Sequence, residues 1–333
     1  MLTETTRHDY ALAVDAADRR GAITIVGDLL SAGIDPLDVL TGLITPSQEA
    51  VGHRWQQGEC TVAQEHAATG VAEAAVATVE AWIAEPADPR GHVVVACAEQ
   101  EWHALAARML AESIRHLGWR TTFLGASTPA RYLGGYLQHL RPDAMILSCT
   151  VPAALAGARA IVRAAAAVGV PTLVGGRALG ADPSRAAALG ASGWAATPQE
   201  VATVLPGLRL RREPLPAPCR PDAEEQAEAL MHTRELFVLA RLAWGEAPGA
   251  ACLHDLDAGA DAAADHAIHA LAATVLTGDS SVLRDADAWL VALLTARGCE
   301  PEAVAQLWAA LAGALGDQFP TARALLRTGL GTG

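Results

Sequence analysis

The sequence has few aromatic residues, little positive charge and no long apolar run. Aromatic side chains make up 4% of the chain, and eight of them are Trp. Because alanine dominates the 51% hydrophobic share, we expect a helix-rich protein whose 333 residues form more than one domain. The net charge of −13 argues against a basic face that displaces counterions from nucleic acid. We therefore expect no direct contact with nucleic acid.

Paired cysteines and targeting segments are also missing. The six cysteines lie far apart without a CxxC motif, so the spacing predicts neither a disulfide framework nor a zinc knuckle. Reduced thiols in a cytoplasmic protein fit this pattern best. The N-terminal residues lack a basic stretch followed by an apolar one, which predicts no signal peptide. No run is long enough to span a bilayer, so we expect no membrane partner.

Residues 1–84 predict a four-helix bundle. Apolar positions recur at helical spacing from about residue 8 onward. Breaks fall at 33–35 and 58–60, and Asp35 and Thr61 are suitable residues for starting the next helix. Short connections between successive helices favour antiparallel packing.

Residues 92–205 change to an alternation of short apolar segments with helical ones. Candidate strands lie at 92–98, 119–125, 143–149 and 171–176, with a weaker one at 192–197. Such alternation predicts an α/β doubly wound parallel sheet, Rossmann-like, with helices on both faces. Ligands of these sheets bind at the carboxyl ends of the strands. A stretch rich in Pro and Arg covers 206–226, the residues after it predict helices alone, and we place the C-terminal helical domain at 223–333.

Polar and small residues follow three of the candidate strands. They are Glu101 and His103 after the first strand, Ser148 and Thr150 at the end of the third, and Gly175 and Gly176 after the fourth. A His in the first strand-to-helix loop projects over the carboxyl edge, where a carboxylate two residues earlier can fix its tautomer for metal binding. The small residues leave a slot for a flat heterocycle. A lone His near a helix start is more often a surface or capping residue, but order, spacing and strand placement together favour the ligand.

These residues resemble the cobalamin-binding domain of corrinoid proteins, whose pattern is DxHxxG, then SxL, then GG. Here Glu101 stands for Asp, Ala106 for Gly and Thr150 for Leu. The resemblance implies that cobalamin binds with its nucleotide base displaced and that His103 is the lower cobalt ligand.

It also implies where the displaced dimethylbenzimidazole tail would go. Ser148 and Thr150 would line its pocket, and Gly175 and Gly176 would flank it.

A second motif lies in the predicted bundle, where nine residues separate Trp55 from Glu65 and His66. This Wx9EH pattern resembles the CarH-type adenosylcobalamin photoreceptors and implies a bundle that covers the upper face of the corrin. An indole is a broad plate against which an adenosine can lie, and Glu and His can bond its polar edges. The alternative is that Trp55 belongs to the bundle core and that Glu65 and His66 are a solvated helix start. The CarH type has a helix-turn-helix before the bundle and a His beside the Trp, where this chain has Gln56.

The last third of the chain resembles the globin-like phycobiliproteins in its 277–285 stretch, a GDxSVL-type turn between helices. A stretch at Cys252 is similar to their chromophore site, although it lies farther from the turn. The order of the three domains resembles the photocobilins, which pair B12 with biliverdin. Candidate bilin-binding residues are Arg234, Arg241, Asp255 and His266. The alternative is an oligomerising helical domain on which these are ordinary surface positions.

The resemblances imply a non-enzymatic, B12-dependent light sensor with adenosylcobalamin as chromophore, and the likeness to the photocobilins implies biliverdin as a second one. Light would break the cobalt–carbon bond and change the conformation, the homo-oligomeric assembly or the binding of a protein partner. Two alternatives stay open. One is a corrinoid methyl carrier for a methyltransferase, and the other is a B12-responsive antirepressor that ignores light.

Overall fold

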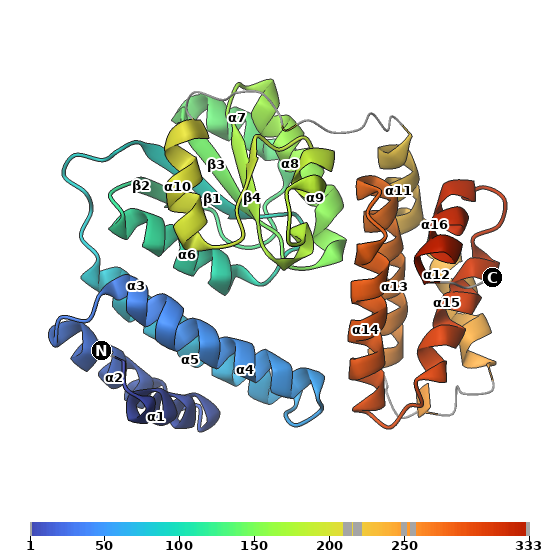
Figure 1. Ribbon diagram of the computed structural model, residues 1–333, viewed down its shortest axis with the longest axis horizontal. Coiled ribbons are helices and arrows are strands. Elements are labelled where there is room, and N and C mark those ends of the chain that lie inside the picture. Colours follow the sequence, from blue (N-terminus) through green and yellow to red (C-terminus); the bar gives the residue numbers. More distant parts are fainter. Residues whose placement is uncertain (1, 209–214, 216–221, 248–251, 254–257, 331–333) are drawn as a thin grey trace.

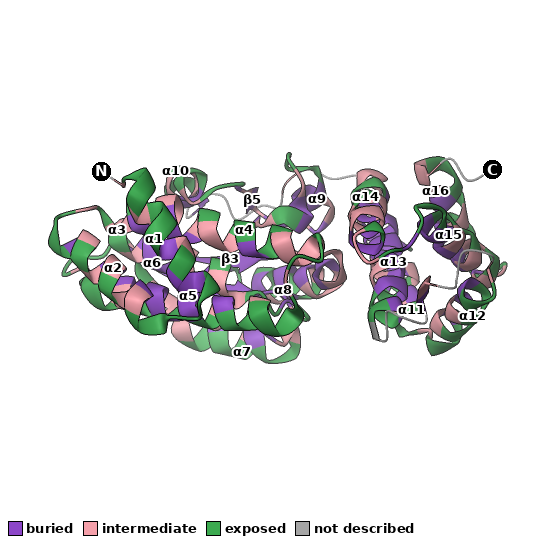
Figure 2. Ribbon diagram, turned by 90° about the horizontal axis from the view of Figure 1, so that it is seen from below, coloured by how far each residue is buried: buried purple, intermediate pink, exposed green. Residues whose placement is uncertain are grey.

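A computed structural model describes residues 2–208, 215, 222–247, 252–253 and 258–330. Three groups of elements follow each other along the chain (Figure 1). N-terminal helices lie beneath a sheet with its covering helices, and a C-terminal group of helices lies beside both. Buried residues concentrate between the sheet and its helices and among the C-terminal helices (Figure 2).

The N-terminal part is helical and packs around one apolar core, which includes Tyr10, Val26, Leu43 and Val76. Its elements are α1 (Glu4–Asp15), α2 (Arg19–Ser31), α3 (Pro36–Val39), the π-helix η1 (Leu40–Ile44), α4 (Thr45–Gln56) and α5 (Val62–Trp82). Both predicted helix starts are confirmed, because Asp35 caps α3 and Thr61 forms a capping box with Gln64 at the start of α5.

The five predicted strands are present and form a parallel sheet in the order β2-β1-β3-β4-β5. Their bounds are β1 (His92–Cys97), β2 (Arg120–Phe123), β3 (Ala144–Ser148), β4 (Thr172–Gly175) and β5 (Gly193–Trp194). The connecting helices are α6 (Ala104–His116), α7 (Ala130–Leu140), η2 (Pro152–Ala154), α8 (Leu155–Ala167), η3 (Arg177–Leu179), α9 (Ser184–Ala188) and α10 (Pro198–Leu208).

Side chains of β1, β3 and β4 alternate between two apolar cores. Ile146 of β3 packs in the core that includes residues of α6 and α10, whereas Met145 and Leu147 pack with residues of α7 and α8. Both faces of the sheet are therefore covered, which explains why the central strands β1 and β3 are almost continuously apolar.

The described C-terminal residues form helices, as the sequence predicts. They are α11 (Ala223–His232), α12 (Arg234–Gly245), α13 (Ala258–Thr277), α14 (Ser281–Thr295), α15 (Glu302–Ala314) and α16 (Pro320–Leu330). The apolar run at 229–244 predicts a single helix, but Thr233 leaves helical geometry with ψ 86° and divides it in two. A globin-like arrangement of these helices stays a prediction. None of the described helices is both long and apolar enough to cross a membrane.

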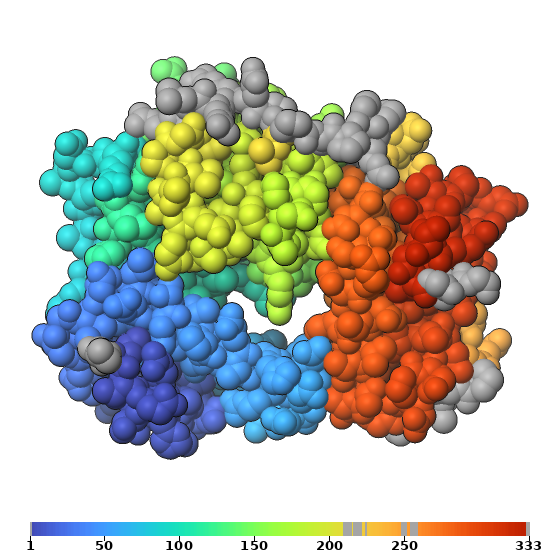
Figure 3. Space-filling model, in the orientation of Figure 1, coloured from blue at the N-terminus to red at the C-terminus, as the bar shows by residue number. Residues whose placement is uncertain are grey.

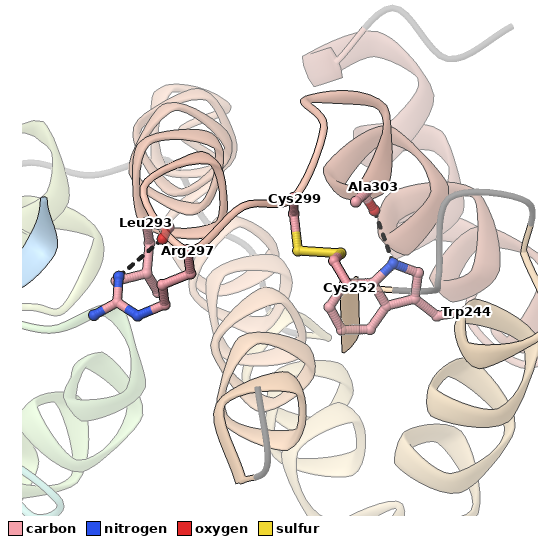
Figure 4. Close-up of a disulfide and its surroundings, with 6 residues drawn as sticks. All are labelled: Trp244, Cys252, Leu293, Arg297, Cys299 and Ala303. Atoms are coloured by element: carbon pink, nitrogen blue, oxygen red, sulfur yellow. Dashed lines mark hydrogen bonds between the residues drawn. A yellow bond between two sulfur atoms is a disulfide. The ribbon is translucent and has the colours of Figure 1, made fainter. Parts of the chain in front are cut away.

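One disulfide corrects the expectation of reduced thiols. Cys252 and Cys299 are joined across 47 residues of sequence (Figure 4). Trp244 lies close by, fully buried, and its indole N–H donates to the Ala303 carbonyl at 2.8 Å. Spacing along the chain did not predict this pair because the two cysteines meet only when α12, α14 and α15 pack together.

Candidate functional site

The three motifs that follow β1, β3 and β4 are far apart in the sequence, but the pairing of these strands brings them side by side. Cys97 at the end of β1 pairs in register with Ser148 at the end of β3, and Ser148 pairs with Gly175 at the end of β4. Because parallel strands point the same way, residues that follow these strands gather at one edge of the sheet. Figure 3 shows an opening bounded by the sheet unit, the N-terminal helices and the helices α13 and α14.

His103 stands at the start of α6 with a carboxylate partner. Its side chain is 69% exposed, and its Nδ1–H donates to Oε1 of Glu101 at 2.7 Å. Glu101 is a carboxylate and can only accept here, so this bond fixes the tautomer and leaves Nε2 as the nitrogen for a ligand. The hydrogen bond to Glu101 raises the pKa of His103, and burial opposes that rise.

Glu101 itself is fully buried and is held by residues from the loop after β3. Its Oε2 accepts from the Thr150 backbone N–H at 2.5 Å, the Thr150 hydroxyl at 2.6 Å and the Val151 N–H at 3.1 Å. Burial alone would raise the pKa of Glu101, but hydrogen bonds from His103 and Thr150 outweigh it and hold the pKa at about 2. Thr150 thus orients the partner of His103, a role that depends on tertiary structure.

Substitution of Glu101 by Gln tests this orientation. The amide presents an NH₂ group where a carboxylate oxygen now accepts, so either the His103 or the Thr150 bonds are lost. We expect cobalamin affinity to fall by about 10- to 100-fold, as for other partners that orient a metal ligand. Titration of the protein with cobalamin, followed by absorption, measures the change. Glu85→Gln, which alters a surface partner of Arg115, is the matched control and should bind like wild type.

Ser148 is buried, and Gly175 and Gly176 lie beside it at the same edge of the sheet. A Cβ on Gly175 would come within 2.7 Å of the Ala195 carbonyl oxygen. One on Gly176, where φ is +103°, would come within 2.3 Å of the Cys149 carbonyl oxygen. Both glycines are therefore required by the close approach of neighbouring backbone. A slot for the nucleotide tail beside Ser148 stays a prediction.

The N-terminal helices bring the second motif to the same opening. Trp55 lies in the last turn of α4 and is half-buried, and Glu65 and His66 lie in the first turns of α5. The Glu65 carboxylate accepts from Thr69 at 2.8 Å and lies near enough to His103 to act on its pKa. His66 is exposed, 3.6 Å from the same carboxylate. Glu65 of this motif therefore lies on the side of α5 toward the loop that carries His103.

Three residues of the C-terminal helices join this site without having been predicted there. Trp289 lies 6.3 Å from Trp55 between ring centroids, and His266 stacks on Trp289 at 4.5 Å. Arg297 lies over the Trp55 ring at 5.3 Å. Burial lowers the pKa of His266 to about 4, so its ring stays neutral at neutral pH. No local sequence signal links these positions to Trp55.

The predicted bilin residues do not form one cluster among the described residues. Arg241 pairs with Asp261 at 2.8 Å, whereas His266 stacks on Trp289 toward Trp55. Arg234 is exposed on α12, and Asp255 lies outside the described residues. Cys252 is held in the disulfide, so its sulfur is not free for a covalent chromophore.

His103 fits a metal that is already held by a macrocycle and needs one further ligand from the protein. No group of three or more His, Cys, Asp or Glu suited to a metal ion occurs in the part of the chain that the structure describes. A metal on His103 would therefore take its other ligands from its carrier, as cobalt does from the corrin ring of cobalamin.

Family models match two parts of the chain. Residues 91–202 match a model described as B12 binding domain, and residues 6–80 match a second model with the same description. The structure is also similar to the monomethylamine corrinoid protein of Methanosarcina barkeri, with a TM-score of 0.53 and 16% identity over 60% of this chain and 96% of that one. This last likeness shows the fold and confirms the Rossmann-like sheet.

Two curated relatives come from Myxococcus xanthus. The HTH-type transcriptional repressor CarH is 35% identical over 145 residues, which is 44% of this chain and 48% of CarH. The HTH-type transcriptional repressor CarA is 36% identical over 88 residues, 26% of this chain and 30% of CarA. The chain thus spans about half the length of the first relative and less of the second. The matches support a CarH-like cobalamin-binding protein, and they give no support to a bilin-binding domain.

These relatives contradict the expectation that the protein makes no direct contact with nucleic acid. Both are helix-turn-helix transcriptional repressors, a class that binds DNA. The expectation rested on net charge, which is a sum over the whole chain. Counterion displacement depends on the local charge of the contacting face, so an acidic total does not exclude it.

Proposed function

We propose that this protein is a light sensor that binds adenosylcobalamin between the sheet unit and the helices α4 and α5. The observation that carries the proposal is His103, oriented by the buried Glu101 at the carboxyl edge of the sheet and close enough to Glu65 of α5 for that carboxylate to act on its pKa. The CarH relative, whose similarity covers nearly half of this chain, supports it.

Each residue has a role that follows from its position. Through Nε2, His103 would bind cobalt from below, while Glu101 keeps the imidazole in the required tautomer. Trp55 would lie against the adenosyl group, with Glu65 and His66 at its polar edge. When bound, adenosylcobalamin supplies a cobalt–carbon bond that visible light breaks.

The response to light would arise because the protein contacts cobalamin differently with and without its adenosyl group. With the adenosyl group gone, Trp55 and α4 lose a surface on which they packed, and another arrangement of α4 and α5 becomes favoured. The output would be a change in self-assembly or in the binding of a protein or DNA partner.

Illumination of the reconstituted protein tests the proposal. We expect green light to change the absorption spectrum and also the elution volume in size-exclusion chromatography, with the protein kept in the dark as the control. A spectrum that changes while the elution volume stays the same would favour the light-insensitive antirepressor. A protein whose spectrum and elution volume both stay constant would reject the sensor.

A corrinoid methyl carrier is the second candidate, and the fold likeness to the monomethylamine corrinoid protein favours it. It would be supported by methyl transfer in the dark, catalysed by a methyltransferase, from the methylcobalamin-loaded protein to an acceptor nucleophile. Biliverdin as a second chromophore stays a prediction for residues 223–333. A red-absorbing band after addition of biliverdin would support it.

A further inference from the structure

Helix α14 connects the two sides of the proposed cofactor site. It runs from Ser281 to Thr295, a length of about 22 Å at 1.5 Å per residue. Figure 1 shows α13 and α14 alongside both the sheet unit and the N-terminal helices, and Figure 3 shows them closing one side of the opening. Contacts at the two ends of α14 attach it to these different parts.

The N-terminal end of α14 is attached to the sheet unit by Arg185 of α9, which is 4% exposed. The Arg185 guanidinium donates to Asp279 at 2.7 Å, to Ser281 at 2.7 Å and to Asp285 at 3.2 Å. It also donates to the Ala178 carbonyl in η3, directly after the glycine pair. Multiple charge-assisted bonds from one buried planar group fix this end firmly.

The C-terminal end of α14 is attached to the last turn of α4 by Arg297. The guanidinium donates to the Trp55 carbonyl at 3.0 Å and to the Gln56 carbonyl at 3.1 Å. The last carbonyls of a helix have no partner within the helix and carry its negative dipole end, so an Arg is well matched to them. A further bond to the Leu293 carbonyl orients the Arg297 side chain, which points away from the disulfide (Figure 4).

The side chain of Trp55 is contacted from the same face of α14. Trp289 and Leu293 are four residues apart and so share one face of α14, and Arg297 lies in the turn directly after the helix. The Trp289 and Trp55 rings are tilted by 35°, and both residues are half-buried, so part of each indole stays accessible to a ligand. His266 stacks on Trp289 and restricts its rotation.

We infer that α14 is a strut that sets the position of Trp55 above the sheet edge carrying His103, and that Arg297 and Trp289 are its positioning residues. The inference rests on the proposed function. A strut of fixed length selects for the size of the upper ligand, because Trp55 packs on a nucleoside-sized group at only one height. A small methyl group does not reach the indole and gains nothing from its position. The C-terminal helices thereby contribute to selectivity for a cobalamin with a bulky aromatic upper group.

Binding measured in the dark tests the strut. Arg297→Ala and Trp289→Ala should each lower the affinity for adenosylcobalamin by about tenfold. The affinity for methylcobalamin should change by less than about twofold. These effects lie in the range measured for coupled contacts. Arg284→Ala is the matched control, since Arg284 lies exposed on α14 and donates to the nearby Ser280. An equal loss for both cobalamins in the variants would overturn the inference.

A double-mutant cycle separates positioning from general destabilisation. If Arg297 acts through Trp55, then Arg297→Ala should cause no further loss of adenosylcobalamin affinity in a Trp55→Ala background. Additive losses would count against the strut.

A readout without cofactor keeps the inference testable if cobalamin does not bind, a result that would reject the proposed function. In the cofactor-free protein, two close indoles couple and give a near-ultraviolet circular dichroism signal. Trp55→Phe and Trp289→Phe should remove the same signal, and Arg297→Ala should reduce it. A signal unaffected by Arg297→Ala would show that Arg297 does not position Trp55.

Discussion

Replacing His103 with Ala is expected to lower the affinity for adenosylcobalamin by about 100-fold, or about 2.7 kcal/mol, because the lower metal–nitrogen bond is lost. The cofactor that still binds should keep its own nucleotide base on cobalt, since no imidazole displaces it. Its absorption spectrum should then resemble that of free cobalamin at the same pH. Glu101 would remain bonded to Thr150, so the loop around it should stay ordered.

The matched control is His139→Ala, which removes an exposed imidazole from α7 on the sheet unit. This variant should bind cobalamin as tightly as wild type and with the base displaced. A His103→Ala protein with wild-type affinity and a displaced base would refute the assignment of the ligand, and with it the proposed function.

Replacing Cys299 with Ser is expected to lower the free energy of unfolding of the C-terminal helices by about 4 kcal/mol, the chain-entropy value for a loop of this length. The disulfide to Cys252 closes 47 residues of sequence, and without it the unfolded chain gains freedom. Buried Trp244 lies beside the pair, so its fluorescence can follow the transition in denaturant. Because the protein has several units, the transition of these helices must be fitted separately.

Two comparisons define the result. Wild type treated with a reductant should unfold like Cys299→Ser, and the reductant should leave the variant unchanged. Cys60→Ser, which removes a free thiol from the turn between α4 and α5, should unfold like wild type under both conditions. Equal stability of wild type with and without reductant would show that the disulfide does not contribute.

The local features of this protein were determined by the sequence itself. The starts of α3 and α5 and the pairing of Glu101 with His103 depend on partners within a few residues, and the strands are recognisable as short apolar segments between helical ones. Short-range patterns of this kind can be recognised in the sequence because the interacting residues are close neighbours along the chain. The cobalamin motifs were found for the same reason, since each is a short segment at the end of a strand or helix.

Only the tertiary structure decided which distant segments complete the site. Thr150 bonds to Glu101 across 49 positions, Arg297 bonds to the Trp55 carbonyl across 242, and Cys252 joins Cys299 across 47. These contacts depend on how whole helices pack, and no local periodicity records that packing. In the sequence, His103 and Trp55 therefore belong to separate motifs. In the fold, α14 connects the sheet unit that carries His103 with the helix α4 that carries Trp55.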